Sequence, residues 1–192
     1  MHALARLTAP ALLGAGLLAA GPAARAGEPA QYIPSPQVVP HGSAPHAKAQ
    51  LLSDVGGRRT YLLILSTGDE VYTALSDFAK AHHVTAAHYT ALGAVHDVQV
   101  GWYDLGRKAY KIIPVEGQVE VVSLTGDIGV ANGKPLPHTH LVVSRPDGEV
   151  RGGHLIHAVV SPTLEITITE EPATLAKKVD EASGLTVFDP KP

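Results

Sequence analysis

The chain has 192 residues, 45% of them hydrophobic, which suits one globular domain with a sizeable core. It carries 15 Lys and Arg against 18 Asp and Glu, and its basic residues never form a run longer than a pair. That balance disfavours proteins that grip nucleic-acid phosphates through clustered cations. Cysteine is absent, which excludes disulfides and leaves only nitrogen and oxygen ligands for any metal site.

Residues 1–26 have the features of a secretory signal peptide. A short basic start at Arg6 precedes an apolar run from Leu7 to Ala20, and Ala24-Arg25-Ala26 has the small-x-small form that a signal peptidase accepts. The run is too short and too rich in alanine for a good membrane span, and no later stretch is long enough. We therefore expect an exported, periplasmic or secreted protein that is cleaved after Ala26.

The remaining chain divides by composition. Residues 27–56 are rich in Pro and Ala without a hydrophobic period, which predicts an extended linker arm. The folded domain is expected over residues 57–189, followed by a short tail at 190–192.

The domain opens with a strand and a helix. The run Arg59 to Ser66 is rich in leucine, aromatic and β-branched residues and predicts a strand. Val71, Leu75 and Phe78 then recur at helical spacing, which predicts an amphipathic helix with one apolar face.

Strands dominate after Val84. Alternating or apolar runs separated by turn residues predict strands over 85–92, 95–103, 109–115, 118–124, 138–144, 153–160 and 163–169, with a bend or loop over 126–134. Residues 171–184 predict a short C-terminal helix, because Pro172 suits a first turn, Leu175 and Val179 share a helical face, and Gly184 suits a stop. The predicted fold class is α+β: a mostly antiparallel or mixed sheet with one central helix packed on it and a short C-terminal helix.

Histidines concentrate between Gly133 and Val160. His138 and His140 are two residues apart, so in a strand both imidazoles face one side. The segment from Arg145 to Gly148 predicts a tight turn, after which His154 returns toward the first two histidines. Three converging imidazoles make metal ligation plausible, although a structural or subunit-interface cluster fits the same spacing.

Several motifs in order resemble the plants and prokaryotes conserved (PPC) domain. The similarity extends over roughly residues 59–189. The matching segments are Gly93-Ala94-Val95, Glu120-Val121-Val122-Ser123-Leu124-Thr125-Gly126, His138-Thr139-His140, Asp147-Gly148, Gly152-Gly153-His154-Leu155, Thr163-Leu164-Glu165-Ile166 and Asp180-Glu181-Ala182-Ser183-Gly184-Leu185.

The resemblance implies an α+β domain that assembles as a homotrimer. It also implies a bound metal, with zinc preferred over another divalent ion, held by the three motif histidines His138, His140 and His154. Plant members of the family carry AT-hooks and bind DNA, but this chain has no Arg-Gly-Arg-Pro hook.

Three functions stay open at this point. The leading hypothesis is an exported PPC-domain protein that binds a metal and plays an undefined role with a small molecule. The alternatives are a DNA-binding protein, as in the plant relatives, and a metal-dependent hydrolase, because three imidazoles with an open position form a catalytic type of zinc ligand set. Glu120 is a candidate general base or a carboxylate that orients one of the ligating histidines, but an exposed strand residue fits its position equally well. His157 is expected to face away from His154.

Overall fold

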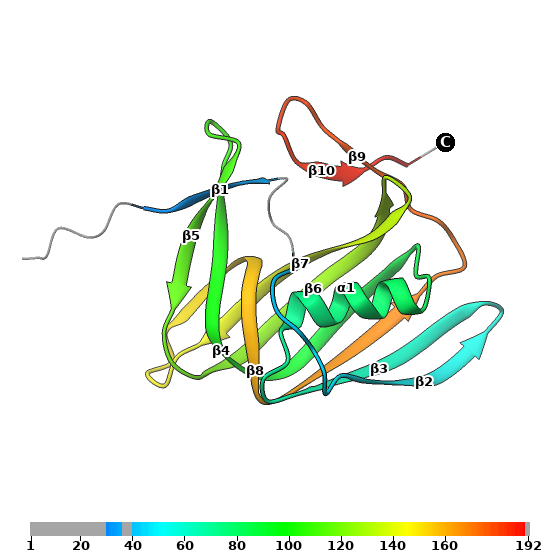
Figure 1. Cartoon of the computed structure of the whole chain (residues 1–192), viewed down its shortest axis with the longest axis horizontal. Coiled ribbons are helices and arrows are strands. Elements are labelled where there is room, and N and C mark those ends of the chain that lie inside the picture. Colours follow the sequence, from blue (N-terminus) through cyan, green and yellow to red (C-terminus); the bar gives the residue numbers. More distant parts are fainter. Residues whose placement is uncertain (1–29, 36–39, 191–192) are drawn as a thin grey trace, which may run out of the picture.

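The computed structural model describes residues 30–35 and 40–190, and the predicted signal peptide lies outside this range. The described chain is built mainly of strands, with one helix (Figure 1). In chain order the elements are β1 (Tyr32–Pro34), β2 (Lys48–Val55), β3 (Arg58–Ser66), α1 (Val71–Ala81), β4 (Ala87–Asp104), β5 (Ala109–Val115), β6 (Val119–Ala131), β7 (Lys134–Ser144), β8 (Val150–Glu170), β9 (Lys177–Val179) and β10 (Thr186–Phe188).

Eight strands form one sheet in the order β1-β5-β4-β6-β7-β8-β3-β2, and all neighbouring strands are antiparallel. The long strands β4 and β8 also pair with each other, so β4, β6, β7 and β8 form a closed circuit of neighbours. Strands β9 and β10 form a separate hairpin. We call the segment 176–188, which contains this hairpin, the C-terminal hairpin.

Helix α1 lies across one face of the sheet (Figure 1). Its N-cap is Glu70, whose carboxylate accepts hydrogen bonds from the backbone N–H groups of Tyr72 and Thr73. The predicted apolar stripe is buried, with Val71 and Leu75 fully enclosed against the strands. Burial of this stripe is the main force that holds a helix of this length in place, because a helix so short is marginal alone. Within the described part of the chain, no helix is long and apolar enough to cross a membrane.

The α+β prediction is wrong in its second helix and in its balance of elements. The protein is mostly antiparallel β-sheet with one helix, and the segment predicted to be a C-terminal helix instead forms β9, a turn and β10. The backbone of Leu175 accepts a hydrogen bond from Val130 of β6, and Ala176 forms a parallel bridge with Val130. These bonds to distant strands outweigh a weak local preference for helix, which is worth only tenths of a kcal/mol per residue.

Two other local expectations also changed. The predicted loop over 126–134 is the end of β6, a tight turn and the start of β7, with left-handed backbone at Asn132 and Gly133 in that turn. Residues 27–56, expected to be a linker arm, contribute β1 and β2 to the two edges of the sheet. Pro34 ends β1, and an edge strand tolerates a residue without a backbone N–H group.

Candidate metal centre

The β7–β8 hairpin places the three motif histidines together. His140 on β7 lies directly opposite His154 on β8, and His138 precedes His140 by two residues on the same face of β7. The turn between the strands is closed by hydrogen bonds from Arg145 N to Glu149 O and from Gly148 N to Arg145 O, both 2.9 Å. Strand alternation and a tight turn therefore suffice to bring three imidazoles to one place.

The imidazoles are close enough to share one ion. The ring centroids of His138 lie 5.2 Å from those of both His140 and His154, and the last two are 5.8 Å apart. Each histidine offers a ring nitrogen, and these atoms lie within 4.8 Å of one another. Two nitrogens that are each about 2.0–2.1 Å from one zinc ion lie no more than about 4.2 Å apart, so a small inward shift of the rings brings all three to one ion.

Glycines allow the strands beside these histidines to approach closely. A Cβ at Gly153, next to His154, would lie 2.5 Å from the carbonyl oxygen of Gly101 on β4. A Cβ at Gly126 on β6 would lie 2.3 Å from the carbonyl oxygen of His138. Gly153 has no left-handed φ, so this glycine serves close packing rather than an unusual backbone angle.

The surroundings favour neutral imidazoles. Burial, together with the nearby His138 and His140, lowers the pKa of His154 to about 3. Burial and the neighbouring His138 also lower the pKa of His140 below its usual value. A neutral imidazole keeps a lone pair for a metal, so at neutral pH both side chains are in the form that coordinates.

The donor set fits a metal ion of the zinc type. The Nδ1 atom of His154 is buried and has no hydrogen-bond partner among the described residues. A buried nitrogen without a partner is costly, and coordination removes that cost. Neutral imidazoles suit zinc and related ions, and three protein ligands leave a position open for another molecule.

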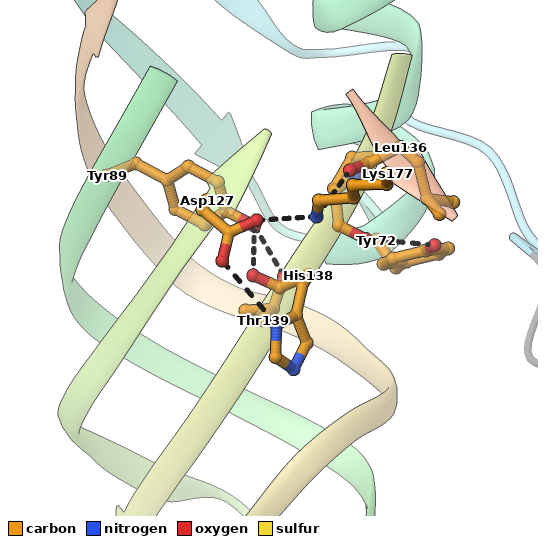
Figure 2. A network of polar contacts seen from close by, with 8 residues as sticks. Tyr72, Tyr89, Asp127, Leu136, His138, Thr139 and Lys177 are labelled. Carbon is orange, nitrogen blue, oxygen red and sulfur yellow. Dashed lines mark hydrogen bonds and ion pairs between the residues drawn. The ribbon is translucent and has the colours of Figure 1, made fainter. Parts of the chain in front are cut away.

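A carboxylate that the sequence did not single out lies behind one of these histidines. Asp127 on β6 pairs with His138 on β7, and its Oδ2 lies 3.5 Å from Nδ1 of His138. Its Oδ1 accepts a hydrogen bond from Nζ of Lys177 on β9 (Figure 2). Burial alone would raise the pKa of Asp127, but hydrogen bonds from His138 and Lys177 outweigh it and hold that pKa below its usual value.

Glu120, the predicted orienter, lies farther along the same strand. It is exposed and pairs with Ser144, four residues beyond His140 on β7. The contact expected of Glu120 is made by Asp127 instead. Asp127 follows the Glu120–Gly126 motif directly, but its register with His138 became known only from the paired strands.

Other histidines of the domain lie outside this group of three. His157 contacts Glu70 at the N-terminal end of α1, with 3.6 Å between Nδ1 and Oε1, and is not part of the group. His88 is exposed on β4 opposite Asp127, and Nδ1 of His96 lies 3.9 Å from Oδ2 of Asp97. His157 therefore stays outside the site, as strand alternation predicted.

The three histidines open into a cavity of about 790 Å³. Its wall is largely aromatic and apolar: the ring of Tyr110 stacks on His154 at 4.5 Å between centroids. Asp127 and Lys177 are the charged residues that line it, and they bind each other. The remaining lining residues are Ser35, Tyr72, Gly101, Trp102, Tyr103, Leu136, Pro137, Gly153, Leu185, Thr186, Val187 and Phe188. A cavity of this size can enclose a small organic molecule beside the histidines.

Comparison with known protein families identifies one match. A family model described as the Plants and Prokaryotes Conserved (PCC) domain, the family written PPC above, matches residues 52–172. This range includes the three histidines and Asp127 but ends before Lys177. A comparison with proteins of curated function finds no match.

Solved structures share the fold. A metal-containing protein from Archaeoglobus fulgidus is 30% identical, with a TM-score of 0.65, over 73% of this chain and 99% of its own. A plant- and prokaryote-conserved protein from Pyrococcus horikoshii is 27% identical, with a TM-score of 0.65, over 76% and 96%. A protein from Ralstonia eutropha, named as a candidate DNA-binding protein, is 29% identical with a TM-score of 0.65 over 73% and 96%.

Proposed function

Because the chain belongs to the Plants and Prokaryotes Conserved domain family, we propose that it binds one divalent metal ion, with zinc preferred, through His138, His140 and His154. The observation that carries this proposal is the convergence of three ring nitrogens within 4.8 Å. The orphaned Nδ1 of His154 and the metal-containing relative from Archaeoglobus fulgidus support it.

We propose further that the metal holds a small molecule in the adjacent cavity. Three protein ligands leave a zinc ion room for a fourth, and the histidines border a space of about 790 Å³. In that role the chain's own residues bind and orient the molecule: the histidines hold the ion that supplies Lewis acidity, and the aromatic wall around Tyr110 encloses the apolar part.

Metal analysis of the purified protein tests the proposal. We expect about one zinc per chain in the wild type and almost none in the His140→Ala variant, because two imidazoles bind zinc far more weakly than three. A Lys80→Ala variant, which removes an exposed ion pair on α1, controls for metal lost or gained during purification. Equal metal content in all three proteins would disprove the ligand set.

DNA binding is the second candidate, since the relative from Ralstonia eutropha is named for it. The acidic charge balance and the absence of any basic run longer than a pair count against it. We expect no shift of a random DNA duplex by this protein at low salt. A shift that weakens steeply as salt rises would favour DNA binding over the small-molecule role.

A hydrolytic reaction is the third candidate and rests on the open position of a three-imidazole site. A panel of ester, amide and phosphoester substrates tests it, with the His138→Ala variant as the matched control. Turnover that disappears in this variant would establish a hydrolase. Zinc binding without turnover would leave a binding protein.

Export and assembly complete the proposal. We propose that residues 1–26 are removed as a signal peptide. Residues 27–56 then precede a domain over 57–189 and add β1 and β2 to the edges of its sheet. We propose that this mature protein is a homotrimer in the periplasm or medium. The mass of the protein recovered from those fractions tests cleavage after Ala26. Light scattering tests the trimer. Exposed apolar residues such as Leu92 and Val122, at 70% and 52%, suit a contact between copies.

A further inference from the structure

Lys177 reaches the candidate metal centre from outside the residues that the family model matches. It lies on β9, in the C-terminal hairpin, and donates hydrogen bonds to Oδ1 of Asp127 at 2.5 Å and to the carbonyl oxygen of Leu136 at 3.2 Å. Its side chain is 2% exposed. A lysine buried to this degree needs such partners, because an unpaired ammonium would lose its hydration without compensation.

We propose that Asp127 and Lys177 are positioning residues for His138, and that docking of the C-terminal hairpin thereby sets the affinity of the metal centre. This inference rests on the proposed metal-binding function. It extends that function to a segment that the three-histidine motif does not include.

The two oxygens of Asp127 have different partners. Oδ1 binds the Lys177 ammonium, and Oδ2 faces Nδ1 of His138 at 3.5 Å, so the carboxylate lies between the lysine and the imidazole (Figure 2). With Oδ1 held, the carboxylate cannot turn freely away from the ring. A carboxylate facing Nδ1 favours the tautomer that carries its proton there, and this leaves the lone pair of Nε2 for a metal.

The backbone of His138 is fixed separately. The hydroxyl of Tyr89 donates to the carbonyl oxygen of His138 at 3.2 Å and bonds the hydroxyl of Thr139 at 2.6 Å (Figure 2). Tyr89 and Thr139 are both buried. The main chain of this histidine is therefore anchored from the core side, which leaves the rotation of its ring to be set by Asp127.

The C-terminal hairpin is seated against β6 by a close backbone approach. A Cβ at Gly129 would lie 2.8 Å from the carbonyl oxygen of Leu175 and 2.9 Å from Cε of Lys177. The Lys177 ammonium also lies over the ring of Phe188, 4.7 Å from its centroid, which joins the two strands of the hairpin above the site. Glycine at 129 thus permits the approach that brings Lys177 to Asp127.

The test compares two lysines of the same hairpin. Lys177→Met removes the ammonium that holds Asp127, whereas Lys178→Met removes an exposed pair with Asp189, in which Nζ and Oδ1 are 2.7 Å apart. Asp127→Asn is a second variant of nearly unchanged size, in case Lys177→Met destabilises the hairpin. Zinc affinity is measured on the full chain by competition with a chelator, after thermal unfolding has shown that each variant is folded.

We expect Lys177→Met and Asp127→Asn each to weaken zinc binding by about 10–100-fold, the usual cost of losing an outer partner of a metal-ligating histidine. Lys178→Met should bind as the wild type does. In the metal-free protein, the ¹⁵N shifts of the His138 ring should show the proton on Nδ1 in the wild type and a mixture of tautomers in Lys177→Met.

The measurements distinguish a wrong positioning role for Asp127 and Lys177 from the absence of a metal site. Wild-type zinc affinity in Lys177→Met and Asp127→Asn would overturn the positioning role and leave the three-histidine site standing. If the wild type itself binds no zinc, the proposed function fails, and the metal-free spectra then decide only whether Asp127 and Lys177 position the ring of His138. A His138 tautomer that is the same in the wild type and in Lys177→Met would overturn it.

Discussion

Two groups of histidines occupy different surroundings in this domain. At the candidate metal centre, three ring nitrogens converge, and a carboxylate lies behind one of them. At the N-terminal end of α1, His41 stacks on His157 with 4.5 Å between ring centroids and 20° between ring planes. Among the described residues, only the first group brings three or more potential metal ligands together.

The carboxylates explain much of this difference. Both oxygens of Glu70 already accept hydrogen bonds from the first turn of α1, including one from the Thr73 hydroxyl, and His157 lies beside that cap. Asp127 does not cap a helix, and its two oxygens instead lie between the side chains of Lys177 and His138. The two groups therefore differ in the direction of their ring nitrogens and in whether the nearby carboxylate is already bound by backbone N–H groups. Both properties matter for holding a metal ion.

Removing one histidine from each group tests whether only the first group binds zinc. His154 and His157 are three residues apart on β8. We expect His154→Ala to weaken zinc binding by more than about 100-fold, because the variant lacks a direct ligand. Loss of a residue that only hydrogen-bonds a ligating histidine already lowers metal affinity by about 10–100-fold. His157→Ala should keep the wild-type affinity. Competition with a chelator measures both, and similar losses in the two variants would erase the distinction between the groups.

The first group should also make the stability of the metal-free protein depend on pH. The pKa of His154 is about 3 in the folded protein against 6.5 in its ordinary state. Below pH 6.5 the unfolded chain therefore gains a proton that the folded chain does not, and the unfolding free energy of the metal-free protein falls toward pH 3. His154 alone contributes a slope of up to about 1.4 kcal/mol per pH unit. Urea unfolding at several pH values measures it, and His154→Gln should reduce the slope.

Glu70, the helix cap beside the second group, should affect the stability of the fold rather than zinc binding. We expect Glu70→Ala to lower the unfolding free energy by about 2 kcal/mol, because it removes the N-cap and leaves buried N–H groups without an acceptor. Zinc affinity should not change. Asp77→Ala, which loses an exposed pair with Lys80 on the same helix, should cost less than about 0.5 kcal/mol. A loss of zinc in Glu70→Ala would show that the groups are coupled.

The smallest effect is expected at Glu120. Its side chain is exposed, and its partner Ser144 lies four positions beyond His140 on β7, so Glu120→Gln should change zinc affinity by less than about twofold. Asp127→Asn is the matched comparison on the same strand. A larger loss in Glu120→Gln than in Asp127→Asn would restore the role that the sequence motif suggested for Glu120.

Much of the strand pattern and the helix could be predicted because local periodicity reports which side of an element is buried. Val71, Leu75 and Phe78 show a helical period and are buried on one face of α1. The C-terminal segment could not be predicted in this way. Leu175 and Val179 are compatible with a helical face, but the backbone bonds of Leu175 go to Thr85 and Val130, far away in the sequence.

By itself, the sequence determined that His138 and His140 share a strand face and that a turn returns the chain to His154. These are consequences of the two-residue period of a strand and of Pro, Asp and Gly in the turn. Only the tertiary structure decided that Asp127, rather than Glu120, faces His138, and that Lys177 holds Asp127. Register between strands and the docking of a distant hairpin depend on packing across the whole sheet, and no local pattern encodes them.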